Sequence, residues 1–575
     1  MTLTHRLVPL VLLVMAGIAH AAPAPTPSPH QGDLLIVSGL ARNAHGKPVH
    51  HAEISVYLDG QPLSAQTPTL TAENGAFEVE FRLPAGALAS ATVEVEASRP
   101  SYKGSGRVPV DQLAEEPGHP AGEAVVMGHH VFVLERAVTP AFWIAAAVLL
   151  LVYGLIALEL MHRTLAALLG AAVLLTVSYT LGTFFPEYHV FSFEDAMAAI
   201  DMNVIFLLMA MMIIVGVLKK TGVFQWMAYK SFQLARGNVF ALSAILMVVT
   251  AVTSAFLDNV TTMLLIIPVT IEIALTLKID PITLLMPEVF ASNVGGTATL
   301  IGDPPNIMIG SYAGLSFLDF VQHLTVVCLI CLAVTVIYFL YWYRKGYATA
   351  QVGDVPAMID RLREEYRITD KTLLVTGGVI LAITVFLFII HGSLHMEPSI
   401  AALLGATVLL VLSRIDIVEM LEHEIEWPTL IFFMALFIVV AGAEETGLIQ
   451  TIADWVYTVS QGSLVAAILL ILWVSAVASA IVDNIPFTAT MLPIVAFLTT
   501  SIPGADGGVL WWALALGACL GGNATMVGAS ANVVTVGMAE KAGHRISFMH
   551  YMKVATVPTV LTIVVASFWL IFVMR

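Results

Sequence analysis

Two short segments that pair an acid with an amide interrupt the long apolar second part of the chain. They are Asp258-Asn259 and Asp483-Asn484, and a third acid, Asp303, stands in a segment rich in glycine and proline. An ionised carboxylate at the centre of a bilayer costs roughly 2.5–3.5 kcal/mol. These acids must therefore face water or a bound ion, or carry a proton. Neighbouring amide and hydroxyl oxygens are the neutral ligands that a hard cation such as sodium prefers.

The segment around Asp303 predicts a helix that is broken inside the membrane. Residues 295–306 read Gly-Gly-Thr-Ala-Thr-Leu-Ile-Gly-Asp-Pro-Pro-Asn. Irregular backbone is tolerated at membrane depth only where it lines a cavity or is buried in protein. Its carbonyl groups can ligate a cation, whereas the N-terminus of a half-helix attracts an anion. The alternative role for Asp258 and Asp483 is structural, because an acid at a hairpin tip also caps the following helix.

The candidate ion- or substrate-binding residues carry a carboxylate or a neutral oxygen, or stand at the break. They are Asp258, Asn259, Thr261, Thr262, Gly296, Thr297, Asp303, Pro305, Asn306, Asp483, Asn484, Asn523, Thr525 and Asn532. Asp303 breaks the symmetry, since its partner position holds Ala529. It is therefore the candidate for the coupling proton or cation. Glu288 and Glu444-Glu445 are weaker candidates.

These motifs occur twice at nearly one spacing. Asp258-Asn259 and Asp483-Asn484 lie 225 residues apart, and Gly295-Gly296 and Gly521-Gly522 lie 226 apart. Several motifs in the same order indicate an internal duplication. Corresponding glycine- or proline-interrupted segments in two halves indicate a transporter binding site. If each Asp-Asn segment turns back without crossing the membrane, the halves are inverted, each with a re-entrant hairpin and a broken helix.

Composition indicates a membrane protein. The chain is 58% hydrophobic and only 11% charged, whereas about a quarter of residues are charged in soluble proteins. Apolar runs of about 20 residues, the length that crosses a bilayer, recur from residue 140 onward. The formal net charge of −16 argues against nucleic-acid binding. We therefore predict repeat 1 at 140–343, a cytoplasmic linker at 344–370 and repeat 2 at 371–575.

The region before residue 140 differs in kind. Residues 1–21 resemble a secretory signal, with an apolar run before Ala19-His20-Ala21, and residues 22–30 form a proline-rich linker. Between 31 and 136, apolar and polar residues alternate, as in Ile54, Val56 and Leu58, which predicts a small β-sandwich. Its histidines show no convincing metal-ligand spacing, so we assign no metal site.

Lysine and arginine predict the orientation. The loops after the third apolar run and after Tyr343 carry clusters of both, whereas the loop between Phe184 and Asn203 has none. The first two are therefore cytoplasmic and the third is external. This agrees with an exported β domain, and predicts a multi-pass inner-membrane protein with that domain periplasmic or extracellular.

Arginine and cysteine limit the choice of substrate. No arginine lies inside the motifs, so no guanidinium is evident for a dicarboxylate. Cys328, Cys331 and Cys519 lie in apolar runs and are interpreted as packing residues, so no cluster of three thiols is present to bind arsenite. Neither His-Glu-x-x-His nor a Ser-Lys pairing occurs, which argues against an enzyme.

The run 291–310, with the preceding 256–264, resembles the arsenite-permease, NhaD and P-protein branch of the ion transporter superfamily, which is related to the citrate and dicarboxylate symporters. The resemblance covers about 140–575 and implies an inverted-repeat, elevator-type α-helical membrane fold, usually dimeric. By position it places sodium and substrate sites at Asn259, Thr261, Gly296, Thr297, Pro305 and Asn306. The second half departs from the pattern, with Ala529-Ser-Ala-Asn532 in place of Asp-Pro-Pro-Asn. The β region resembles carboxypeptidase-regulatory-like or transthyretin-like domains.

We therefore expect a secondary active transporter that moves a small ion, either by sodium/proton exchange or as a small oxyanion. Na⁺ or H⁺ is the expected coupling ion, and no cofactor is expected. Two alternatives stay open. One is a sodium-coupled citrate or dicarboxylate symporter. The other, of a different class, is a membrane receptor or sensor that uses the external β domain. The expected partners are the lipid bilayer, the transported ion and a second copy of the chain.

Overall fold

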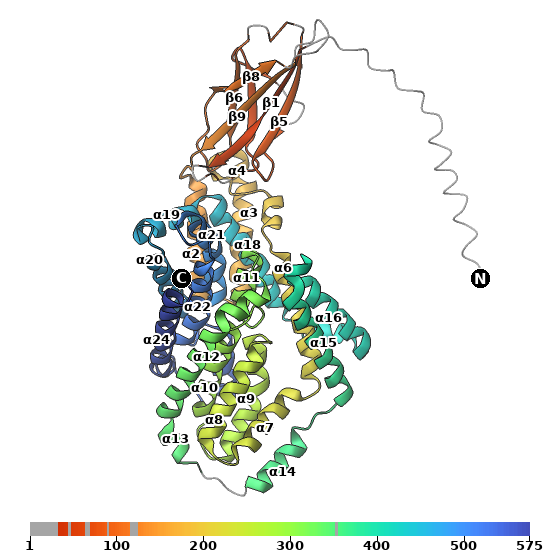
Figure 1. Cartoon of the computed structure of the whole chain (residues 1–575), viewed down its shortest axis with the longest axis vertical. Coiled ribbons are helices and arrows are strands. Elements are labelled where there is room, and N and C mark those ends of the chain that lie inside the picture. Colours follow the sequence, from red (N-terminus) through yellow and green to blue (C-terminus); the bar gives the residue numbers. More distant parts are fainter. Residues whose placement is uncertain are drawn as a thin grey trace, which may run out of the picture. The chain divides into compact units, whose positions relative to one another are not determined.

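The chain folds into two compact units, 1–137 and 138–575. The structure, a computed structural model, describes residues 33–43, 46, 48–63, 69–84, 86–88, 91–115, 125–350 and 355–574 (Figure 1). The predicted signal segment, 1–21, and the linker, 22–30, lie outside these residues.

The first unit consists of β-strands in two sheets. One sheet has the order β5-β1-β9-β8, and the other has the order β3-β2-β6-β7, with β4 also paired to β2. Apolar side chains that alternate along the strands, among them Ile54, Val56 and Phe77, form one core, as the sequence pattern predicts. The strands are β1 (Asp33–Asn43), β2 (Glu53–Leu58), β3 (Gln61–Leu63), β4 (Thr69–Leu70), β5 (Ala76–Leu83), β6 (Val93–Ser98), β7 (Val108–Pro109), β8 (Gln112–Glu115) and β9 (Val125–Leu134).

The second unit is helical, and ten of its described helices are long and apolar enough to cross a membrane. The helices are α2 (Pro140–Ala157), α3 (Arg163–Tyr179), α4 (Leu181–Phe184), α5 (Phe193–Ala198), α6 (Met202–Lys219), α7 (Val223–Ala235), α8 (Val239–Ser254), α9 (Asn259–Thr276), α10 (Ile282–Thr297), α11 (Pro304–Ala313), α12 (Phe317–Trp342), α13 (Arg344–Ala348), α14 (Val355–Glu365), α15 (Lys371–Ile390), α16 (Pro398–Ser413), α17 (Ile417–His423), α18 (Trp427–Glu445), α19 (Leu448–Ser460), α20 (Leu464–Ile481), α21 (Asn484–Ser501), α22 (Val509–Gly521), α23 (Ser530–Lys541) and α24 (Phe548–Phe572).

The two Asp-Asn segments connect consecutive helices. Asp258 joins α8 to α9, and its Oδ1 accepts a hydrogen bond from the backbone N of Thr261 at 2.9 Å. Asp483 joins α20 to α21, and its Oδ1 accepts one from the backbone N of Ile485 at 3.1 Å. Both acids therefore cap the second helix of their pair, which is the structural role weighed from the sequence. We call these two connections the first tip and the second tip.

Both predicted breaks are present, although the first lies later than the glycine pair suggested. Helix α10 continues through Gly295 and Gly296 to Thr297, and α11 starts at Pro304. The irregular backbone is therefore 298–303. In the second half α22 ends at Gly521 and α23 starts at Ser530. Glycine does not end α10 because its backbone is held by close packing on α8 rather than by propensity alone.

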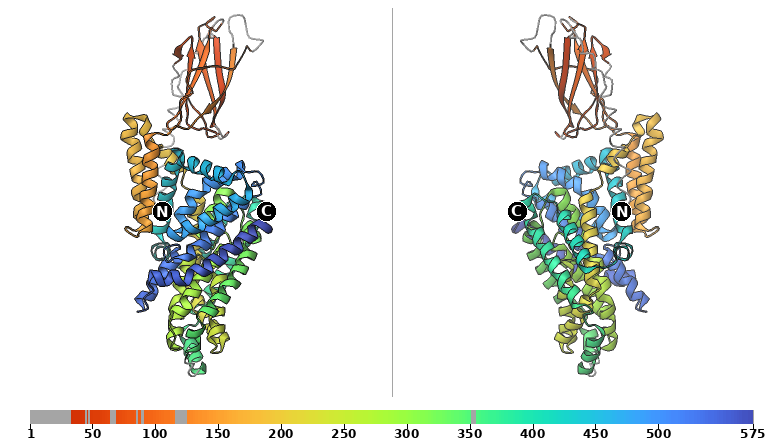
Figure 2. Two further views of the ribbon diagram at one scale, coloured as in Figure 1. Left: turned by 90° about the vertical axis from the view of Figure 1, so that its left-hand side faces the viewer. Right: turned by 90° about the vertical axis from the view of Figure 1, so that its right-hand side faces the viewer.

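The helices of the second unit pack in corresponding pairs. Helix α8 lies along α10, and α20 lies along α22; α3 lies against α18, and α16 lies against α6. Figure 2 shows α2 and α3 side by side at one edge of the helical unit. These pairings bring the two tips, the two breaks and the start of α3 to one place.

Candidate functional site

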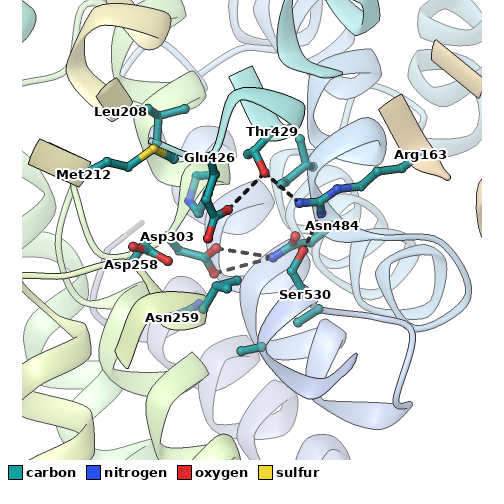
Figure 3. A pocket seen from close by; sticks show the side chains of 15 residues that line it. Arg163, Leu208, Met212, Asp258, Asn259, Asp303, Glu426, Thr429, Asn484 and Ser530 are labelled. Carbon is teal, nitrogen blue, oxygen red and sulfur yellow. Dashed lines mark hydrogen bonds between the residues drawn. The ribbon is translucent and has the colours of Figure 1, made fainter. Parts of the chain in front are cut away.

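A small cavity of about 40 Å³ lies where the first and second tips meet the breaks. A single water needs roughly 10–15 Å³, so this space fits a small ion with a few waters. Its polar walls come from helices far apart in the sequence (Figure 3). The polar lining residues are Arg163, Asp258, Asn259, Asp303, Glu426, Thr429, Asn484 and Ser530.

Three carboxylates face this cavity from one side. Asp258 comes from the first tip, Asp303 from the start of α11 and Glu426 from the start of α18 (Figure 3). Asp303 is 2% exposed, and both of its carboxylate oxygens lie 3.5 Å from the amide nitrogen of Asn484. Within the described chain, none of the three forms an ion pair. A buried carboxylate without a cation, such as Asp303, needs a proton or a bound ion.

An arginine stands on the opposite side of the cavity, which corrects the sequence-based statement that no guanidinium is evident. Arg163, the first residue of α3, places Nη1 3.0 Å from Oδ2 of Asp483 and 2.6 Å from Oγ of Ser530. Its Nη2 lies 3.2 Å from Oγ1 of Thr429. The charge of Asp483 is therefore paired, and the guanidinium is already engaged by three oxygens.

A second, larger cavity of about 660 Å³ adjoins the small one. The two share Arg163, Val260, Glu426, Thr429 and Ser530 as lining residues. The larger cavity is also lined by the loop between α2 and α3, including Glu159 and His162. It therefore provides an approach to the carboxylates from the side on which α2 ends.

Asparagine side chains hold the broken segments together. Nδ2 of Asn306 donates to the carbonyl oxygens of Thr297 at 3.0 Å and Thr299 at 2.8 Å. Nδ2 of Asn532 donates to those of Gly522 at 2.9 Å and Thr525 at 2.8 Å. These carbonyls were expected to ligate a cation. Each keeps a second lone pair, but their first role is to fix the backbone of each break.

The first break is also tied to the first tip. With the side-chain amide of Asn259 oriented so that its nitrogen faces the nearby acceptors, this nitrogen donates to the carbonyl oxygens of Gly302, at 3.1 Å, and Ser292, at 3.2 Å. The position of Asp303 beside the cavity therefore depends on this contact, since Asp303 follows Gly302 directly. The amide contact also leaves Oδ1 as the end of Asn259 that a cation can use.

The two halves brace each other through residues that occupy matching positions. Nδ2 of Asn293, on α10, donates to Oδ1 of Asn523 and Oδ1 of Asn532, both at 2.9 Å. The matching position on α22 is Cys519, whose Sγ donates to Oδ1 of Asn306 at 3.6 Å. Cys519 is therefore a hydrogen-bonding residue of the site as well as a packing residue. Cys328 and Cys331 are buried thiols on α12, as expected.

Replacing Asn293 with leucine is expected to destabilise the helical unit. Asn293 is fully buried, and the substitution removes the donor from two buried carbonyl oxygens, which costs about 2 kcal/mol or more. A drop of several degrees in the thermal unfolding midpoint of the detergent-purified protein should follow. Gln322→Leu, at an exposed position of α12, is the matched control and should leave the midpoint unchanged. Equal midpoints for both variants would show that the hydrogen bonds of Asn293 do not stabilise the helical unit.

The structure separates the sequence candidates into three groups. Asp258, Asn259, Asp303 and Asn484 line the small cavity, and Asp483 lines the larger one. A second group supports the backbone of the tips and breaks, and its members do not belong to the cavity lining. That group is Thr261, Gly296, Thr297, Pro305, Asn306, Asn523, Thr525 and Asn532. Thr262 is fully buried, and its hydroxyl has no partner among the described residues.

Sequence reasoning missed Arg163, Glu426, Thr429 and Ser530. Glu426 gave one usable signal, because it matches Asp201 at the start of the equivalent helix in the first half. Arg163 gave a weaker signal, as a charge next to an apolar run. Only the packing of α3 against α18 brings it to the second tip.

Comparison with known proteins identifies relatives across the helical unit. Residues 153–517 match the family described as "Citrate transporter", CitMHS. The chain is 43% identical over 429 residues to an uncharacterized transporter of Mycobacterium tuberculosis, with 74% of this chain and 97% of the relative covered. It is 36% identical over 504 residues to the human P protein, with 75% of this chain but only 59% of the relative covered.

One solved structure shares the helical fold. The crystal structure of the YdaH transporter of Alcanivorax borkumensis matches with a TM-score of 0.51 and 14% identity, covering 71% of this chain and 98% of that chain. At that identity the likeness concerns the fold alone. The expected polytopic helical transporter fold is thereby confirmed.

Proposed function

The chain belongs to the citrate transporter (CitMHS) family of membrane transporters, and from that premise we propose that it exchanges a small monovalent cation, such as Na⁺, for protons. It is a multi-pass membrane transporter and not an enzyme. The observation that carries the proposal is the set of three carboxylates, Asp258, Asp303 and Glu426, around a cavity large enough for an ion.

The charge of the small cavity favours a cation over an anion. Asp258, Asp303, Glu426 and Asp483 together outnumber the single guanidinium of Arg163, which is paired with Asp483. An anion that enters would lose its water beside carboxylates, whereas a cation or protons would neutralise them. Protons and a metal cation that neutralise the same groups exclude each other, and such competition is the basis of exchange.

A carboxylate substrate is the second candidate, because two features favour it. The family is described as citrate transporters. The larger cavity, about 660 Å³, has room for an organic anion, and Arg163 and His162 line it. Sodium-coupled citrate or dicarboxylate symport therefore remains the runner-up.

We further propose that the two halves are inverted repeats and that they work by an elevator motion. Supporting this, α8–α9 and α20–α21 form the two tips, and α10–α11 and α22–α23 form the two broken helices. The lysine and arginine distribution favours a cytoplasmic position for the end of α2. The larger cavity, lined by that loop, would then open to the cytoplasm.

Reconstitution into liposomes tests the exchange. Vesicles loaded with Na⁺ and diluted into sodium-free buffer should acidify inside as Na⁺ leaves and protons enter, reported by a trapped pH-sensitive dye. Protein-free vesicles, and vesicles in which choline replaces Na⁺, should show no such change. If the protein instead takes up labelled citrate or succinate in a sodium-dependent way, without proton movement, the runner-up replaces the proposal.

A further inference from the structure

We infer that the guanidinium of Arg163 takes the place of a bound cation at the second tip, so that the exchangeable cation binds only at the first tip. This inference rests on the proposed cation exchange and deepens it, because it assigns one transported cation to one of two related tips. It also identifies a latent monovalent-cation site at Asp483. Three observations support it.

The first is the way the guanidinium is held. Arg163 bonds Asp483, Ser530 and Thr429, and its Cζ lies 5.3 Å from the ring centre of Phe432. The exposed fraction of the side chain is 23% for Arg163 and 8% for Asp483. A charge pair this enclosed is costly to break by removing one partner, because the other charge is left buried and unpaired. Asp483 therefore requires a cation, and in this conformation the chain supplies it.

The second observation is a difference in residue type between the two tips at positions related by the duplication. The acid is retained as Asp258, but the groups that hold the guanidinium are absent. Val204 stands at the position of Thr429, Leu207 at that of Phe432, and Pro304 at that of Ser530. The first tip therefore has the acid without the side chains that would receive an arginine.

The third is the helix that supplies the arginine. Oγ1 of Thr164 donates to the carbonyl oxygen of Pro428 at 2.7 Å, and the backbone N of Ser399 donates to Oδ1 of Asn203 at 3.1 Å. Pro428 and Asn203 occupy matching positions in the duplication. The start of α16 thus contacts the start of α6 in the same way as the start of α3 contacts the start of α18. Thr164 of α3 therefore corresponds to Ser399 of α16. The residue before Thr164 is Arg163, whereas the residue before Ser399 is Pro398, so α16 offers the first tip no arginine at this position.

The charges facing Asp483 differ from those facing Asp258 in consequence. Arg163 and Ser530 lie against Asp483. Asp258 shares its cavity with Asp303 and Glu426, and with the apolar Leu208 and Met212 of α6. Removing the arginine's charge should leave Asp483 with the same need for a cation that Asp258 has. The hydroxyl and amide oxygens nearby suit Na⁺.

Direct binding of labelled Na⁺ to the full-length protein in detergent, at pH 8, tests this. The wild type should bind about one Na⁺ per chain, and Arg163→Gln should bind about two. Arg163→Gln/Asp483→Asn should return to one. Arg163→Lys keeps the charge and should also bind one. Thr429→Val removes one hydrogen bond to the guanidinium and one to Oε2 of Glu426. It should bind a second Na⁺ with lower affinity, and serves if Arg163→Gln does not fold.

The outcomes separate this inference from the exchange proposal. If a folded Arg163→Gln or Thr429→Val protein binds no more Na⁺ than the wild type, the inference is overturned, and the arginine is only a clamp. If the wild type binds no Na⁺ yet Arg163→Gln binds one that Asp483→Asn removes, the latent site stands while the proposed exchange at the first tip fails.

Discussion

Replacing Asp303 with asparagine is expected to lower proton-coupled cation flux by about 100-fold, while the protein stays folded. The substitution keeps the shape of the side chain and removes only its charge and its proton. Losing one charged partner of a bound ion costs about 1.5–3 kcal/mol, and each 1.4 kcal/mol is a factor of ten in affinity. Asp303 also lies between the two tips, next to Asn484, so it contacts both halves of the site.

Folding should survive because the side chain of Asp303 makes long contacts, at 3.5 Å, with the amide of Asn484, and asparagine keeps an oxygen that can accept one of them. Asp303 precedes α11, but its side chain makes no capping hydrogen bond. The matching position, Ala529, starts α23 without any carboxylate. The break therefore forms without an acid, and the acid at 303 is available for function.

The measurement is dye-reported proton flux in sodium-loaded liposomes, with thermal unfolding of the same protein as the folding check. Asp506→Asn, in an exposed loop between α21 and α22, is the matched control and should transport at the wild-type rate. Normal coupled flux in Asp303→Asn would show that the exchange does not use this carboxylate.

The sequence predicted the tips and breaks because their signals are local. An acid and an amide between apolar runs, or Gly-Gly and Pro-Pro in an apolar segment, identify the element wherever it packs. The position of the first break was missed by a few residues, since α10 continues past Gly296 to Thr297. Close packing of Gly295 against Ala251 of α8 outweighs the low helix propensity of glycine.

The composition of the site could not be predicted in the same way. Arg163 meets Asp483 across 320 residues of sequence, and Glu426 meets Asp303 only through the packing of α18. No local sequence pattern predicts either of these two long-range contacts. The same limit applies to Asn306 and Asn532, whose residue type suggested ion ligands. In the structure both donate to the backbone carbonyls of their own break.

The substitution Gly302→Ala is expected to weaken the exchangeable cation site. A Cβ atom there would lie 2.6 Å from the carbonyl oxygen of Gly296 and 2.7 Å from that of Ser254. Both are backbone atoms, so the break itself must move. Overpacking of this kind costs about 1–3 kcal/mol. The shift would also displace the Gly302 carbonyl from the Asn259 amide, and with it Asp303. Coupled flux and Na⁺ binding should both fall by about tenfold or more.

Gly528 provides a matched variant, because it occupies the same position in the second break. A Cβ atom there would lie 2.6 Å from the carbonyl oxygens of Gly522 and Ser479. Both substitutions should therefore lower the unfolding midpoint by similar amounts. Gly537→Ala on α23, where a Cβ atom meets nothing within 4 Å, should lower neither stability nor binding.

Sodium binding then distinguishes the two breaks. If the cation of the second tip is Arg163, distortion beside it displaces none of the three carboxylates of the small cavity, so Gly528→Ala should weaken Na⁺ binding less than Gly302→Ala does. Equal loss of Na⁺ binding in both variants would contradict this division. Two segments alike in sequence and backbone would thus differ in function, because Arg163 reaches the second tip, whereas the corresponding first residue of α16 is Pro398, which carries no charge.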